Sequence, residues 1–211
     1  MDPDKIAQIR AVIASGKSAQ RDSTGLEFWY LERSARLHHL IELPPGNEAE
    51  ALRLFVERYI DFLPDCLEHF HALAERANIS QYTGLFLDLA IDFLLSQPEG
   101  VELHSYGHLI DEAYMAHRLL EELNDRCLRY LGGPAMPADT AFANLIMHSI
   151  IGEAYANELD MAVQYAIEAN GELEKNVLSG LQPAPLHELA DAAQNWPVFG
   201  EDLSVGVKFH Y

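Results

Sequence analysis

Cysteine and positive charge are both scarce in this chain of 211 residues. The two cysteines, Cys66 and Cys127, have no C-x-x-C neighbour and make no disulfide framework, as is usual in a reducing compartment. Lysine and arginine total 14 against 33 acidic residues, which gives a formal net charge of −19. Such a charge repels nucleic-acid phosphates and anionic lipid. We therefore expect neither nucleic acid nor a membrane as a partner.

Long hydrophobic runs and targeting signals are also missing. The longest uncharged, mostly apolar run is Thr140–Gly152, which is too short to cross a bilayer. The first residues, MDPDKIAQIR, lack the basic-then-apolar order of a secretory signal. Gly132-Gly133-Pro134 is interpreted as a helix break and not as a phosphate-binding loop. Together with the two unpaired cysteines, these observations predict a cytoplasmic protein.

Hydrophobic residues make up 49% of the chain and recur at helical spacing between glycine- and proline-rich breaks. The fold class predicted is all-α, a single-domain bundle of six to seven helices over residues 1–211, with two long antiparallel helices near its C-terminal end. Residues 196–211 are predicted to form an extended tail and not a sheet. The predicted helices are Pro3–Ser15, Thr24–Leu43, one from Asn47 past Leu73, Ser80–Ser96, Val101–Leu131, Pro137 to about Val177, and a short Pro185–Ala193.

Two of these helices carry unusual features. Pro64 lies inside the third helix, where it predicts a kink or a break. The fourth helix, Ser80–Ser96, is apolar around almost its whole circumference, which predicts a central position in the bundle.

Several charged or titratable residues lie where a core is normally apolar. Asp88 and Asp92 interrupt the apolar fourth helix, Glu112 borders the core face of the fifth, His148 lies in the apolar part of the sixth, and Arg33 lies within the stripe of the second. One interpretation is that these groups satisfy one another, with Arg33 neutralising the carboxylates. The other is that they line an interior cavity as metal ligands or as acid and base.

The second interpretation predicts a divalent metal, iron or zinc. Glu112 and His148 would be ligands, and Asp88 and Asp92 would be ligands or would orient them. His108, one turn after His104 and at the margin of its core face, is a further candidate ligand. Two aromatic residues at helical spacing are candidates for the wall of a ligand pocket, namely Tyr30 and Tyr155.

The stretch Leu31-Glu-Arg-Ser-Ala-Arg-Leu-His-His39 resembles the proximal-histidine helix of heme-oxygenase-like proteins, and the region Tyr59–Glu68 is compatible with that family. The resemblance implies an all-α bundle. It implies no heme site, because Leu85–Leu95 contains no glycine where the family has a glycine-rich distal helix. A ferritin-like bundle is the second analogy, although its paired ligand motifs are absent.

No complete catalytic set is present, and no catalytic residue is assigned. The sequence favours a binding or regulatory module, forming a homodimer, for a protein or a small apolar ligand. The alternative is a metal-dependent oxidoreductase with a buried carboxylate and histidine site.

Overall fold

The computed structural model describes residues 2–20, 24–96, 106–136, 139–171 and 206–209. Within these ranges the fold is all-α, with one two-residue strand pair added. The helices are α1 (Pro3–Gln20), α2 (Thr24–Ser34), α3 (Glu48–Arg76), α4 (Ser80–Leu95), α5 (Tyr106–Leu131), α6 (Asp139–Ile151) and α7 (Glu153–Ala169). None of the described helices is both long and apolar enough to cross a membrane.

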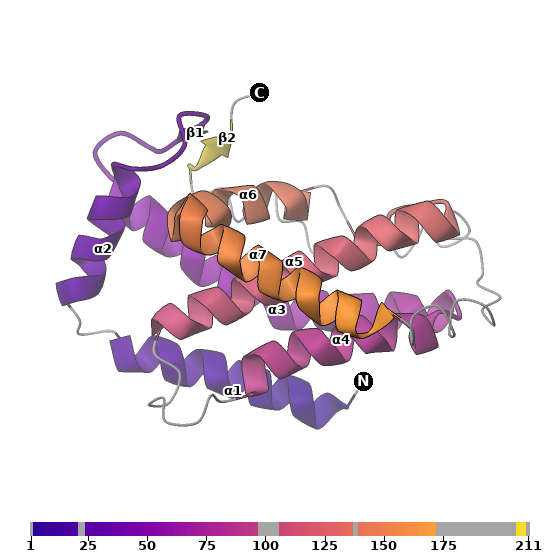
Figure 1. The fold of residues 1–211 in the computed structure, drawn as a ribbon. Helices are drawn as coiled ribbons and strands as arrows, with labels where there is room; N and C mark the ends of the chain where they lie inside the picture. The colour runs from indigo at the N-terminus through magenta and orange to yellow at the C-terminus, as the bar shows by residue number, and fades with distance from the viewer. Residues whose placement is uncertain (1, 21–23, 97–105, 137–138, 172–205, 210–211) are drawn as a thin grey trace.

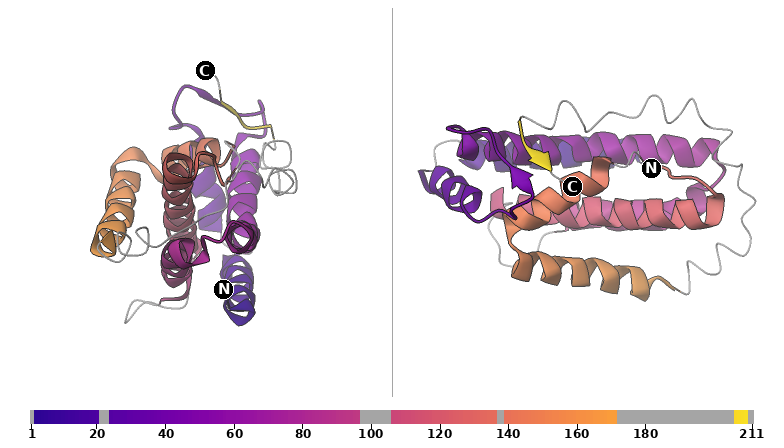
Figure 2. Two further views of the ribbon diagram at one scale, coloured as in Figure 1. Left: turned by 90° about the vertical axis from the view of Figure 1, so that its right-hand side faces the viewer. Right: turned by 90° about the horizontal axis from the view of Figure 1, so that it is seen from above.

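Helices α3 and α5 form the middle of the bundle and lie side by side along its long axis (Figure 1). α5 also packs against α1, α4, α6 and α7, while α2 packs across the N-terminal part of α3. Figure 2 shows α7 on the outer flank of the molecule. The apolar faces of these helices meet in one continuous hydrophobic core.

The third predicted helix is confirmed as one long element. α3 runs without a break through Pro64, whose side chain is buried in the core. Asn47, the residue just before this helix, makes no side-chain capping bond. The Glu48 carboxylate instead accepts a hydrogen bond from the Gly46 N–H just before the helix.

The second predicted helix ends earlier than its apolar stripe indicates. α2 stops at Ser34, where the Ser34 hydroxyl donates to the Leu31 carbonyl, so His39 lies in a loop and not on a helix. The loop is held to α6, because the Ser149 hydroxyl accepts a hydrogen bond from the His38 N–H. Ile41–Glu42 then form β1.

The sixth predicted helix is divided into α6 and α7 at Gly152. This glycine has a φ of +103°, a conformation that side-chain-bearing residues rarely adopt. The prediction of two long antiparallel helices near the C-terminal end is therefore wrong in part. Helix α5 is long, but it is followed by two shorter helices, α6 and α7. Residues beyond Gly171 in that prediction, like the short helix 185–193, lie outside the described residues.

Two of the described residues in the predicted tail 196–211 form a strand, where the sequence predicted no sheet. Lys208–Phe209 (β2) pair antiparallel with β1, with Ile41 opposite Phe209 and Glu42 opposite Lys208. Gly206, just before β2, packs against Pro44. The part of the tail from 196 to 205 lies outside the described residues.

Candidate functional site

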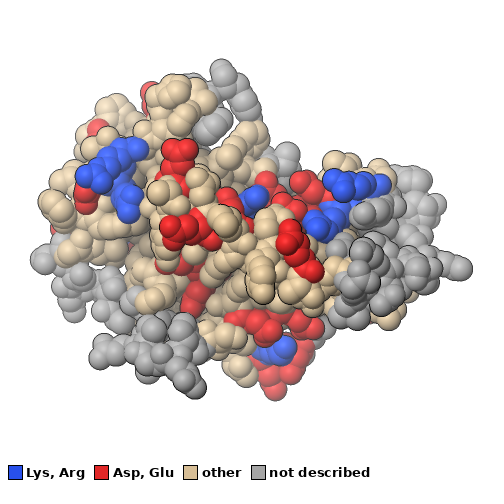
Figure 3. Space-filling view, viewed as in Figure 1, with Lys and Arg blue, Asp and Glu red and all other residues tan. Residues whose placement is uncertain are grey.

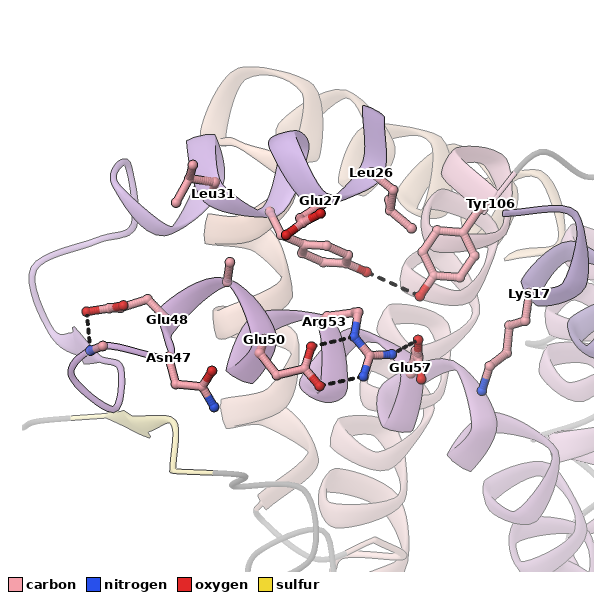
Figure 4. Close-up of a pocket in the computed structure, with 13 residues that line it drawn as sticks. Lys17, Leu26, Glu27, Leu31, Asn47, Glu48, Glu50, Arg53, Glu57 and Tyr106 are labelled. Carbon is pink, nitrogen blue, oxygen red and sulfur yellow. Dashed lines mark hydrogen bonds and ion pairs between the residues drawn. The ribbon is translucent and has the colours of Figure 1, made fainter. Parts of the chain in front are cut away.

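A pocket of about 680 Å³ lies between α2 and the start of α3 (Figure 4). We call it the α2–α3 pocket. Its walls come from α1, α2, the turn before α3, α3 itself and the start of α5. The lining residues are Lys17, Leu26, Glu27, Tyr30, Leu31, Gly46, Asn47, Glu48, Ala49, Glu50, Arg53, Glu57 and Tyr106.

Acidic side chains dominate the charge of the α2–α3 pocket. Four carboxylates and two cations line it, and both cations already have carboxylate partners. Arg53 bonds Glu50 through two nitrogens, at 2.6 and 2.7 Å, and Glu57 through a third. Lys17 pairs with Asp61 at 2.6 Å. The pocket therefore keeps an excess of negative charge.

Two tyrosine rings close the inner end of this pocket. The Tyr30 hydroxyl donates to the Tyr106 hydroxyl at 3.2 Å, and both side chains are buried. Burial raises the pKa of both hydroxyls, that of Tyr106 to about 12. Both groups therefore stay neutral at physiological pH and add no charge to the pocket wall.

A second pocket of about 320 Å³ lies between α2, α5, α6 and α7, and we call it the Arg33 pocket. It shares Leu26 and Tyr106 with the α2–α3 pocket. Its other lining residues are Gly25, Trp29, Arg33, Gly107, Ile110, Asp111, Ile151 and Tyr155. The two residues predicted to line a ligand pocket thus lie in different ones, Tyr30 in the first and Tyr155 in the second.

The inward placement predicted for Asp88 and Asp92 is wrong. Both side chains are exposed, and Asp88 lies 3.6 Å from Lys5 of α1. Helix α4 buries only part of its circumference, through residues such as Phe86, Leu87 and Ile91. Apolar residues on every side of the helix concealed which side faces solvent.

The remaining metal candidates come from two helices, with His108 and Glu112 one turn apart on α5 and His148 on α6. Glu112 is buried, and burial raises its pKa to about 7, with the neighbouring Asp111 adding to the effect. His108 is exposed. His148 is half-buried, with its Nε2 3.2 Å from Asn157 and 3.8 Å from Asp160.

The described residues contain no group of three or more histidine, cysteine, aspartate or glutamate side chains placed to hold a metal ion. The five candidates from the sequence are therefore not brought together there. Arg33 makes no ion pair with any described carboxylate, so the predicted neutralisation of core acids by this residue is also not seen. Instead of the predicted metal centre, the structure contains a hydrogen-bond network between helices.

This interhelix network consists of Tyr59, Asn144, Glu121, Arg118 and Asp160 and joins α3, α6, α5 and α7. The Tyr59 hydroxyl donates to Asn144 Oδ1, and Asn144 Nδ2 donates to Glu121, each at 2.6 Å. Arg118 pairs with Glu121 and donates to Asp160 at 3.0 Å. Each polar group thus has a partner, which stabilises the bundle without leaving a group free for chemistry.

A buried histidine next to this network was not among the residues selected from the sequence. His117 is 2% exposed, donates from Nε2 to the Tyr59 carbonyl at 3.0 Å, and lies 4.2 Å from the Tyr59 ring. Burial lowers its pKa to about 4. The signal was its spacing, four residues after Ala113 and three before Leu120, which places it on the core face of α5.

Fold and pockets together define an all-α bundle with ligand-sized cavities beside α2. No family model, curated protein or solved structure matches the chain. The heme-oxygenase-like and ferritin-like architectures therefore remain analogies, and the proposals below are based on the geometry.

Proposed function

We propose that this protein is a non-catalytic binding module for a small organic cation with an apolar body, held in the α2–α3 pocket. The observation that carries the proposal is the uncompensated negative charge around a cavity that also offers two tyrosine rings. Carboxylates attract an ammonium group, and the two neutral tyrosines form part of the wall for its apolar body. The volume of about 680 Å³ is within the range of small-molecule sites.

The two ends of the pocket suit the two ends of such a ligand. Leu26 and Leu31 of α2 lie on one side of the pocket, and the row Glu50–Arg53–Glu57 lies along α3 on the other (Figure 4). The apolar body would contact the leucines and rings, and the ammonium group would approach the carboxylates. A homodimer, or a protein partner, stays a prediction from the sequence.

Titration calorimetry with three probes of similar shape tests this function. Phenethylamine should bind more tightly than neutral 2-phenylethanol, and 3-phenylpropionate should not compete for this pocket. Removing two carboxylates with the double variant Glu27→Gln and Glu48→Gln should weaken phenethylamine binding about three- to tenfold, because each exposed charge contributes only modestly.

The matched control is the double variant Glu153→Gln and Glu158→Gln, which makes the same change of net charge on the exposed side of α7. It should leave phenethylamine binding nearly unchanged. Equal affinities for the amine and the alcohol, or equal losses in both double variants, would contradict the proposal, since the pocket charge would then play no specific part.

A further inference from the structure

Arg33 differs from every comparable arginine in the described structure. Four described arginines are half-buried: Arg33, Arg53, Arg118 and Arg126. Arg53, Arg118 and Arg126 each pair with at least one carboxylate. For Arg33 no ion pair or side-chain hydrogen bond is found among the described residues. In a chain with more than twice as many acidic as basic residues, an unpaired and half-buried guanidinium is unexpected.

Two neighbours fix the position of this guanidinium. Its central carbon lies 5.4 Å from the centre of the Trp29 ring, as in a cation–π contact. On another side it lies against Gly152, where a Cβ atom would come within 2.9 Å of the Arg33 Nη1. The glycine that divides α6 from α7 therefore also leaves room for the guanidinium, and a side chain at position 152 would displace it.

The guanidinium lines a cavity whose walls are otherwise mostly apolar. Leu26, Ile110 and Ile151 contribute aliphatic surface to the Arg33 pocket, and Trp29 contributes an aromatic ring. Asp111 is the carboxylate among the described lining residues, and it accepts a hydrogen bond from the Tyr155 hydroxyl at 2.9 Å. Asp111 and Arg33 thus line one cavity without pairing.

We infer that the Arg33 pocket is a second binding site, which takes the carboxylate of a small organic acid with a flat apolar body. A guanidinium presents paired N–H donors that match the two oxygens of a carboxylate. The volume of about 320 Å³ limits the ligand to a small molecule. The apolar body would lie against Trp29 and the isoleucines. In Figure 3, basic side chains over α2 stand apart from the acidic middle of the face.

The probe for this site is 3-phenylpropionate, titrated into the full chain by calorimetry and followed by the indole N–H signal of Trp29 in NMR spectra. Arg33→Met should weaken binding at least tenfold, because the charge-assisted hydrogen bonds to the carboxylate are lost. Arg33→Lys should recover part of the affinity, since a lysine keeps the charge but loses the paired donors. Asp111→Asn should tighten binding about two- to threefold, because it removes a like charge.

Phenethylamine gives the control, because its binding in the α2–α3 pocket should be the same in Arg33→Met as in the natural chain. Thermal unfolding of Arg33→Met shows that the variant is folded. The inference is overturned if 3-phenylpropionate does not bind at millimolar concentration, or if it binds the natural chain and Arg33→Met equally. Neither result bears on the cation site, whose probe and variants are different.

Discussion

Arg118 and Arg33 are both half-buried arginines, but the regions around them differ. Arg118 lies inside the interhelix network, where Glu121 and Asp160 accept its hydrogen bonds. Arg33 lies beside a cavity, packed on Trp29 and Gly152, with no described carboxylate within ion-pair distance. The difference separates two uses of a buried charge. A charge whose partners are all inside the protein stabilises the fold, whereas one that faces a cavity without a partner is available to a ligand.

The largest expected effect is the loss of stability on changing Arg118. Arg118→Met leaves Glu121 and Asp160 half-buried without their cation, which should lower the free energy of unfolding by about 3–4 kcal/mol. For a chain of this length the melting temperature would fall by roughly 6–16 °C. Arg33→Met should cost less than about 1 kcal/mol, the size of an exposed cation–π contact. Equal losses in the two variants would remove the distinction between the regions.

A second effect is the pH dependence that His117 gives to the network region. Its pKa falls from an unfolded value near 6.5 to about 4 in the folded chain. The unfolded chain therefore binds more protons between these values, so stability present above pH 6.5 is lost as the pH falls towards 4. The contribution should be about 2–3 kcal/mol.

Denaturant unfolding of the natural chain and of His117→Gln, at pH 7 and pH 4.5, measures this contribution. The glutamine keeps a donor for the Tyr59 carbonyl but does not titrate. The stability of the His117→Gln variant should therefore fall less on acidification than that of the natural chain. Glu112 has the opposite slope, because its raised pKa of about 7 favours the folded state at low pH. Glu112 is present in both proteins, so its contribution cancels when the pH dependence of one protein is subtracted from that of the other. The exposed His39→Gln is the control, and a difference of similar size there would refute the assignment to His117.

The smallest of these effects tests a single bond of the network. Tyr59→Phe removes the hydroxyl that donates to Asn144 Oδ1 and leaves that buried oxygen without this donor. The expected loss is about 1–2 kcal/mol in the free energy of unfolding. Tyr165→Phe, which removes the hydroxyl of an exposed side chain on α7, should cost less than about 0.5 kcal/mol. If Tyr59→Phe lowered the free energy of unfolding no more than the control variant does, the network would not be a stabilising unit.

The sequence was sufficient for the fold class, because apolar residues at helical spacing mark α3 and α5 directly. It was not sufficient for α4, where apolar residues on every side hid the exposed position of Asp88. The break at Gly152 was also missed. A single glycine in an apolar run is compatible with a continuous helix, and only the backbone conformation shows that the chain turns there.

Candidate sites were harder to predict than helices for a physical reason. Periodicity places a residue on one face of its own helix, but a site depends on which faces meet. The sequence singled out Arg33 and Tyr30, and both line pockets. It did not show that Arg33 lacks a carboxylate partner. Asn144 lies within the uncharged run 140–152, and an amide in such a run is a signal of a buried polar contact that can be sought in other sequences.

The short ladder between β1 and β2 has a consequence for folding. Its paired residues, such as Ile41 and Phe209, are more than 160 positions apart in the sequence. Closing a loop of this size costs substantial chain entropy, and a two-residue ladder repays little of it. The ladder therefore depends on the helices that bring its strands together, and we expect it to form late in folding and to open early in unfolding. Amide hydrogen exchange within the β1–β2 ladder would then report on an early-opening part of the described structure, next to the turn at Gly46 that lines the α2–α3 pocket.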